Sequence, residues 1–171
     1  MNQKLEKLNH ATEETAISDL LSCCGSSKWA EKMAEARTFA DSDILLKKAE
    51  EIWRNLEIKD WLEAFGTHPK IGAKKKVQQA TAQSAEWSEG EQSGINAANN
   101  SVLTELEESN YLYEKKFGFI FIVCATGKSV AEMLEICQER LSNSSDKEIF
   151  IAADEQRKIT EIRLKKLLEI E

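Results

Sequence analysis

A single proline, at position 69, stands in the 171 residues of this chain. Proline breaks helix interiors, because its ring clashes with the preceding turn and it has no amide hydrogen to donate. Its scarcity therefore favours a fold built from long helices. The length suits one domain, and neither an internal repeat nor a low-complexity linker interrupts the chain. We predict an all-α, single-domain bundle of about eight helices over residues 1–171.

Apolar residues recur at helical spacing along most of the chain. Asp41 and Asp43 place acidic groups where the positive end of a helix should begin. Ser88, followed three residues later by Glu91, fits a capping box, so a helix should start near Ser88 and run to about Ala98. The other predicted helices cover residues 11–23, 26–39, 41–56, 60–65, 101–115, 128–141 and 146–170.

Residues 117–126 are rich in aromatic and β-branched side chains, a composition that favours a strand over a helix. No second strand is visible to pair with this segment, and a lone buried strand would leave costly unpaired backbone groups. We therefore predict a buried extended or irregular segment in the helical bundle, with amides that could hydrogen-bond a ligand. A plain core helix or strand is the alternative on the sequence alone.

The formal net charge of −7 would repel a phosphate backbone, which argues against a nucleic-acid partner. Three consecutive lysines, at 74–76, are typical of a solvated loop. The longest apolar run, residues 119–125, is far shorter than the ~20 residues of a membrane span, and no signal peptide or peroxisomal tail is visible. We predict a cytoplasmic protein with no membrane partner.

The four cysteines are Cys23, Cys24, Cys124 and Cys137, and the chain has only two histidines. No Cys-x-x-Cys pair occurs among them, so the set does not make a zinc site, and we predict no bound metal. Neighbours such as Cys23 and Cys24 rarely bridge each other. We therefore predict four reduced thiols, as in a reducing compartment.

Arg163 stands in an apolar stripe, because it shares one face of the terminal helix with Ile159 and Leu167. Burying an unpaired charge costs several kcal/mol. The guanidinium must therefore either reach out to water along its apolar stem or meet an anion inside the protein. Its planar fork of donors suits a carboxylate or an amide-rich heterocycle.

His68 lies within residues 66–85, the stretch without clear periodicity, and the following Pro69 biases it toward an extended conformation. Loops between helices often carry functional groups, and an unperturbed imidazole titrates at about pH 6.5, near enough to neutrality for proton exchange. A turn or surface histidine is the alternative. For Glu91 the alternative is a purely structural role as the capping partner of Ser88, although a helix N-terminus also presents amides to anions.

These residues belong to an ordered series of segments that resembles the 2-oxo-4-hydroxy-4-carboxy-5-ureidoimidazoline (OHCU) decarboxylases of purine breakdown. His68-Pro69 is similar to the family's catalytic motif, and Ser88-x-x-Glu91-Gln92 is similar to a second motif. The resemblance covers nearly the whole chain, and the order of its segments makes it specific. The remaining segments are residues 23–29, 113–129, 140–143, Glu148 and 158–164.

The resemblance implies an all-helical homodimer that uses no cofactor and converts OHCU to (S)-allantoin and carbon dioxide in urate degradation, as a carboxy-lyase. Carried onto the matching positions, His68 is the acid–base residue, Glu91 is its carboxylate partner, and Arg163 holds the substrate. The other residues implied to line the site are Pro69, Ser88 and Gln92, with the backbone of Phe121, Ile122, Val123, Cys124 and Ala125.

The chain departs from the family pattern at Thr38, where the family often has proline, and in a longer stretch between His68 and Glu91. The longer stretch leaves the conformation of residues 74–85 open. Other functions are open too. A non-catalytic helical domain that binds allantoin-like ureido compounds would tolerate the loss of His68, and a structural helical adaptor would have no pocket. A different decarboxylase or hydrolase acting on a related ureido ring is a further alternative.

Overall fold

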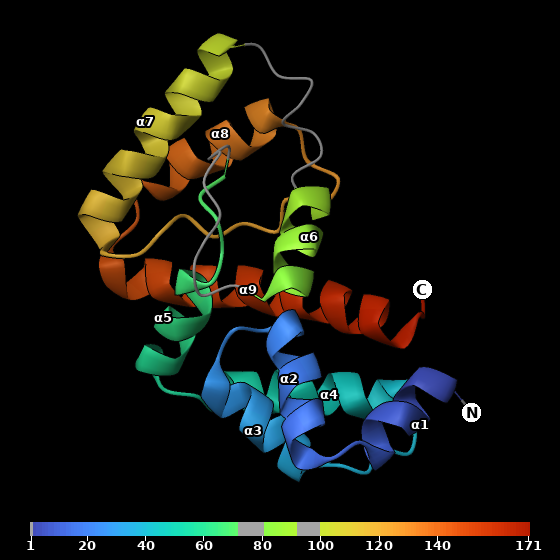
Figure 1. The fold of residues 1–171 in the computed structure, drawn as a ribbon. Coiled ribbons are helices and arrows are strands. Elements are labelled where there is room, and N and C mark those ends of the chain that lie inside the picture. Colours follow the sequence, from blue (N-terminus) through green and yellow to red (C-terminus); the bar gives the residue numbers. More distant parts are fainter. Residues whose placement is uncertain (1, 72–80, 92–99) are drawn as a thin grey trace. The chain divides into compact units, whose positions relative to one another are not determined.

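The computed structural model describes residues 2–71, 81–91 and 100–171, and every regular element in those ranges is a helix (Figure 1). Because no strand occurs within them, the all-α prediction is confirmed. The nine helices of these ranges are α1 (Gln3–His10), α2 (Glu13–Cys23), α3 (Ser27–Glu35), α4 (Ser42–Arg54), α5 (Ile58–Gly66), α6 (Ala82–Glu91), α7 (Asn100–Phe117), α8 (Val130–Arg140) and α9 (Ser145–Leu168).

Helix starts are fixed by side-chain caps. Asp41 caps α4 as predicted, and its carboxylate accepts the amide of Ile44 at 2.8 Å. A full capping box opens α8, where the Ser129 hydroxyl accepts the amide of Glu132 at 3.2 Å and the Glu132 carboxylate accepts the amide of Ser129 at 2.6 Å. These contacts satisfy amides that have no partner inside their own helix.

The capping box predicted at Ser88 is wrong. The hydroxyl of Thr81 accepts the amide of Ser84 at 3.0 Å, so α6 begins directly after Thr81, and Ser88 and Glu91 lie in its last turn. The start was hard to locate from sequence because the residues that α6 buries are Ser84 and Ser88, not apolar side chains. The predicted continuation of this helix over residues 92–98 lies outside the described residues.

The chain folds into two compact units. The first comprises residues 1–64 and 157–171, and the second comprises residues 65–156. α9 contributes to both, since its residues 145–156 belong to the second unit and its residues 157–168 belong to the first. That the whole chain acts as one domain stays a prediction.

In the first unit α3 packs against both α2 and α4. Trp29 of α3 is fully buried and donates its indole N–H to the carbonyl of Ala49 on α4 at 3.1 Å. Trp61 of α5 donates in the same way to the carbonyl of Trp53 at 3.0 Å. An indole that buries its ring while its donor is satisfied adds both apolar area and a directional contact to the packing of helices.

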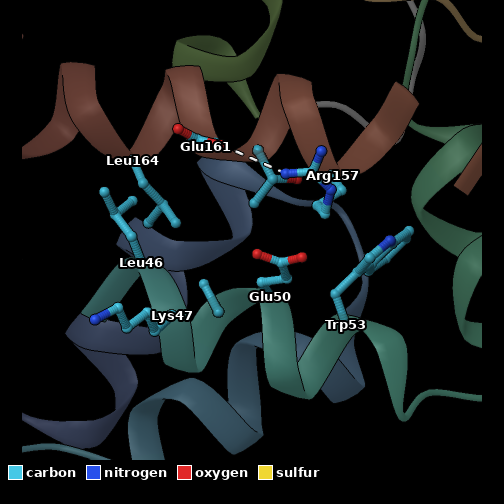
Figure 2. Close-up of a pocket in the computed structure, with 9 residues that line it drawn as sticks. Leu46, Lys47, Glu50, Trp53, Arg157, Glu161 and Leu164 are labelled. Atoms are coloured by element: carbon cyan, nitrogen blue, oxygen red, sulfur yellow. Dashed lines mark hydrogen bonds and ion pairs between the residues drawn. The ribbon is translucent and has the colours of Figure 1, made fainter. Parts of the chain in front are cut away.

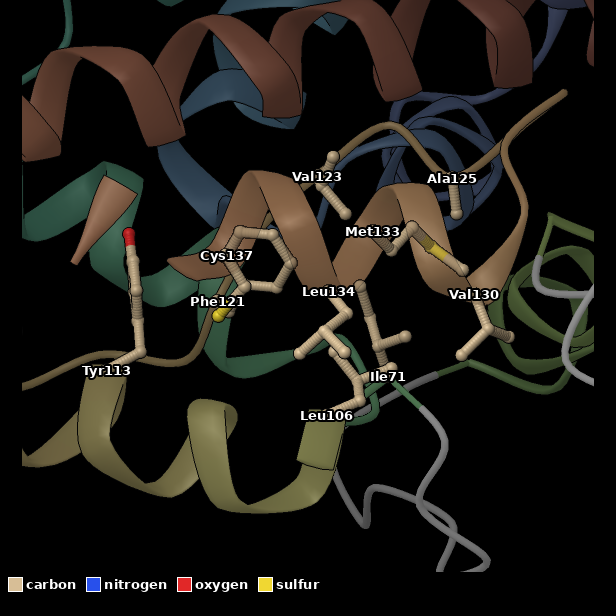
Figure 3. Close-up of a cluster of buried hydrophobic side chains, with 10 residues drawn as sticks. All are labelled: Ile71, Leu106, Tyr113, Phe121, Val123, Ala125, Val130, Met133, Leu134 and Cys137. Carbon is tan, nitrogen blue, oxygen red and sulfur yellow. The ribbon is translucent and has the colours of Figure 1, made fainter. Parts of the chain in front are cut away.

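The core of the second unit lies between α7, α8 and the segment that follows α7 (Figure 3). Phe121–Ala125 are all buried, and residues 120–125 adopt no regular secondary structure. The side chains of Phe121, Val123 and Ala125 enter the core cluster, an alternation typical of extended backbone. The predicted buried extended segment is therefore confirmed. Its partners in the cluster are Ile71, Leu106, Tyr113, Val130, Met133, Leu134 and Cys137.

A buried ion pair supports this segment in place of a second strand. Arg140 of α8 donates to the carbonyl of Ile122 at 2.7 Å and to the carboxylate of Glu148 on α9 at 2.6 Å. Tyr113 donates its hydroxyl to the same carboxylate. Burial and the contact with Glu148 raise the pKa of Tyr113, while the nearby Arg140 lowers it. The network ties the extended backbone to α7, α8 and α9, and it satisfies the buried carbonyl of Ile122.

Candidate active site

His68 lies two residues after the end of α5 and is buried, with 9% of its surface exposed. Its amide donates to the carbonyl of Phe65 at 3.2 Å, which continues the last turn of α5 into the loop. Its imidazole Nε2 lies 2.6 Å from Oε1 of Gln156 on α9. The alternative of a surface histidine is therefore wrong, since this ring is enclosed and held by a side-chain hydrogen bond.

Gln156 is a functional candidate that sequence reasoning missed. It has no exposed surface, and a buried amide needs hydrogen-bond partners. The available signal was helical spacing, because the apolar stripe through Ile159 and Arg163 extends back by one turn to Gln156. A polar residue on such a stripe marks a buried contact in the same way that Arg163 does.

Charged groups hold the backbone of Cys124 inside the extended segment. Its amide donates to the carboxylate of Glu155 at 2.7 Å, and its carbonyl accepts from the ammonium of Lys128 at 2.8 Å. Burial raises the pKa of the Cys124 thiol, Glu155 and more weakly Glu91 raise it further, and Lys128 opposes them. Glu91 thus lies within electrostatic reach of the extended segment, and the second unit brings these two predicted parts of the site together.

The second unit contains most of the predicted site residues, namely His68, Pro69, Ser88, Glu91 and the segment 121–125. Ser88 is buried in the last turn of α6, whereas Pro69 and Glu91 are half-buried. Gln92 lies outside the described residues.

Arg163 belongs to the first unit and is 1% exposed, so its guanidinium does not reach out to water. Burial raises the pKa of the Cys23 and Cys24 thiols, and Arg163 lies close enough to both to oppose part of that rise. Ile159 and Leu164, its neighbours on α9, are buried as well. A charge this deep requires compensating contacts, and of the two outcomes expected for Arg163, this burial excludes reaching out to water, while an anion inside the protein stays a prediction.

A cavity of about 150 Å³ lies in the first unit between α4 and α9 (Figure 2). Side chains of both charge signs face it, including an ion pair between Arg157 and Glu161 at 3.5 Å. None of the predicted site residues within the described ranges lines it. The lining residues are Leu46, Lys47, Ala49, Glu50, Trp53, Arg157, Thr160, Glu161 and Leu164.

All four cysteines are free and buried. Burial raises the pKa of Cys24 to about 11 and that of Cys137 to about 12. An unfolded thiol ionises at about pH 8.5, so the stability that these neutral thiols contribute is complete below that pH and is lost as the pH rises through 11 to 12.

We expect Ellman's reagent at pH 8 to titrate four thiols quickly in urea and almost none in the native protein. Fast reaction of a native thiol would contradict this burial.

Within residues 2–71, 81–91 and 100–171, no group of three or more histidine, cysteine, aspartate or glutamate side chains could hold a metal ion. No helix in these parts of the chain is long and apolar enough to cross a membrane.

Taken together, these features define a class of protein. It is all-α, and its buried imidazole lies within hydrogen-bonding distance of the side chain of a glutamine on a helix. Its buried extended segment is contacted by the carboxylate of Glu155 and the ammonium of Lys128. A side chain held in this way is typical of sites for acid–base chemistry. Residues 9–165 match the model of the OHCU decarboxylase family, and the chain belongs to that family.

Several known proteins are similar to this chain. The Arabidopsis thaliana uric acid degradation bifunctional protein TTL is 45% identical over 147 residues, which are 85% of this chain and 45% of that protein. A 2-oxo-4-hydroxy-4-carboxy-5-ureidoimidazoline decarboxylase of Halalkalicoccus jeotgali is 25% identical over 95% of this chain and 90% of its own. The chain spans less than half the length of the bifunctional relatives that it matches.

A solved structure supports the same family. A crystal structure of an OHCU decarboxylase in the presence of (S)-allantoin matches with a TM-score of 0.77 and 41% sequence identity. The match covers 93% of this chain and 99% of that one.

Proposed function

We propose that this protein is a carboxy-lyase that converts OHCU to (S)-allantoin and carbon dioxide in urate degradation, without a cofactor. The observation that carries the proposal is the family match over residues 9–165, a range that contains His68, Glu91 and Arg163. The 41% identity to an OHCU decarboxylase crystallised with (S)-allantoin supports the same reaction.

The first step of the proposed reaction breaks the bond between the ring carbon and its carboxylate. Carbon dioxide leaves, and the bonding electron pair passes into the conjugated ring of the substrate, which serves as the electron sink. The protein must orient the carboxylate and stabilise the charge that develops on the ring. In our proposal the guanidinium of Arg163 holds the substrate for this step, because its fork of donors suits a carboxylate or an amide-rich ring. Gln92 assists it.

The second step delivers a proton to one face of the resulting carbanion, which gives a single enantiomer. His68 is the proposed proton donor. Its burial and its contact with Gln156 favour one orientation of the ring, as stereospecific delivery requires. Glu91 is proposed to orient His68 and to raise its protonated fraction. Pro69, Ser88 and the segment 121–125 are proposed to line the site.

Replacing Glu91 with alanine tests the role proposed for its carboxylate. Because Glu91 lies in the last turn of α6 and does not cap its start, the substitution should not remove a helix cap. We expect kcat to fall by about 10²-fold, a typical effect of weakening acid–base catalysis. Glu89→Ala, an exposed change in the same helix turn, is the matched control and should retain full activity. Wild-type turnover in Glu91→Ala would leave this carboxylate without a catalytic role.

We propose further that the active form is a homodimer, a property that the family resemblance implies, and that it works in the cytoplasm. Light scattering coupled to size exclusion tests the assembly, and a monomeric mass at working concentration would contradict it.

A further inference from the structure

We propose that Gln156 is a positioning residue for His68, with its side-chain carbonyl accepting a hydrogen bond from Nε2–H, so that Nδ1 is the nitrogen that exchanges a proton with substrate. In this scheme Nδ1–H gives its proton to the carbanion, and a neutral ring that keeps Nε2–H is left. Nδ1 then takes a proton from solvent before the next cycle. The inference rests on the function proposed for His68, but the position of the ring protons can be measured without any turnover.

The chemistry of the contact assigns the donor. Nε2 of His68 and Oε1 of Gln156 lie 2.6 Å apart, and an amide oxygen can only accept a hydrogen bond. With Oε1 of Gln156 facing the ring, Nε2 carries a proton in the neutral ring as well as in the charged ring. Any change in protonation then takes place at Nδ1, and the contact fixes the tautomer of the neutral form.

Burial makes this contact hard to replace by water. Gln156 has no exposed surface, and His68 is 9% exposed. A buried glutamine is costly unless its amide forms hydrogen bonds, whereas a leucine of similar size would have no polar group to satisfy. The hydrogen bond to His68 meets that requirement for its oxygen.

The loop that carries His68 has backbone anchors of its own. The His68 amide donates to the carbonyl of Phe65 at 3.2 Å, and the side-chain amide of Asn110 donates to the carbonyl of Ile71 at 3.1 Å. These contacts hold the loop backbone on both sides of Pro69. Gln156 instead contacts the ring, so its role is to set the orientation and protonation pattern of the imidazole.

Nitrogen-15 NMR of histidine-labelled protein tests the assignment directly. The chain has two histidines, and His10 is exposed at the end of α1, so His10→Gln leaves the His68 ring alone in the spectrum. We expect a proton on Nε2 that exchanges slowly enough to be seen in water, and an Nδ1 that gains and loses its proton with pH. A neutral ring with its proton on Nδ1 and a bare Nε2 would overturn the proposal, because the Gln156 amide would then be the donor.

Three variants separate positioning from stability. Gln156→Leu should lose the Nε2–H signal and lower kcat about a hundredfold with little change in KM, as expected when a reacting group is misplaced. Gln156→Glu keeps an oxygen acceptor and should keep the signal and recover part of the lost kcat. Gln138→Leu, at an exposed position on α8, is the control and should change neither.

The outcomes also distinguish this inference from the proposed function. An intact Nε2–H signal and wild-type kcat in Gln156→Leu would overturn the positioning role. A wild-type protein that shows the signal but forms (S)-allantoin no faster than the uncatalysed reaction would overturn the enzyme assignment, and the assigned hydrogen bond would stand.

Discussion

Asparagine in place of His68 should lower kcat for decarboxylation by about 10²- to 10⁴-fold, the range typical of losing a general acid or base. Asparagine keeps a hydrogen-bonding group near Gln156, so the buried amide is not left without a partner. It cannot gain or lose a proton near neutral pH, and so it cannot supply the second step. The rate is measured from the circular dichroism of the allantoin formed from freshly generated substrate.

His10→Asn is the matched control, since His10 is 76% exposed on α1 and its loss should leave kcat unchanged. The melting temperature of each variant is measured beside its activity. A folded His68→Asn protein that keeps more than a tenth of the wild-type kcat would mean that the proton comes from another group.

Leucine in place of Arg140 should produce the largest loss of stability, about 3–5 kcal/mol in the free energy of unfolding. Glu148 has no exposed surface and Arg140 is 7% exposed, so removing the guanidinium leaves a carboxylate buried without its charge partner. The carbonyl of Ile122 loses its donor as well. Urea denaturation monitored by far-ultraviolet circular dichroism measures the change in unfolding free energy.

The matched control is Arg54→Leu, which breaks an ion pair with Glu50 whose side chains are 61% and 44% exposed. An exposed pair contributes only about 0–1 kcal/mol, so this variant should unfold close to the wild-type midpoint. If Arg140→Leu fails to fold alone, the double variant Arg140→Leu/Glu148→Leu should recover part of the loss, because no buried charge is then left uncompensated. Equal losses in Arg140→Leu and Arg54→Leu would show that the buried pair contributes little.

Much of the fold could be predicted because local signals and tertiary structure agree. The extended segment was predicted from its composition together with the absence of a pairing strand, and its buried, alternating side chains confirm that reasoning. What the sequence could not show is how its backbone is satisfied. The contacts from Arg140 and Glu155 come from helices distant in sequence, and no local pattern identifies them.

Elements were missed where the local signal was weak or misread. α1 is capped by Asn2, whose side chain accepts the amides of Lys4 and Leu5, and this cap was available in the sequence. α6 buries Ser84 and Ser88, so hydrophobic periodicity could not locate its start. The boundary between the two units at residues 156 and 157 falls inside the helix α9, so no change in composition marked it in the sequence.

The candidate site likewise contains one residue that the sequence identified and one that it did not. Arg163 could be identified from sequence because a charge on an apolar stripe is conspicuous, and its burial confirms the premise. Gln156 occupies the same stripe but carries no charge, and its importance depends on His68, which lies 88 positions earlier in the chain. The catalytic roles of His68, Glu91 and Arg163 stay predictions.

The most direct test of the central claim is the enantiomeric composition of allantoin formed by the wild-type protein. Substrate generated freshly from urate is mixed with the protein, and the circular dichroism of the product is followed against a reaction without protein. Rapid appearance of (S)-allantoin alone is the result that a stereospecific decarboxylase predicts. Slow formation of racemic allantoin, at the rate of the protein-free reaction and with folded protein present, would contradict the assignment and leave a non-catalytic binding domain as the better account.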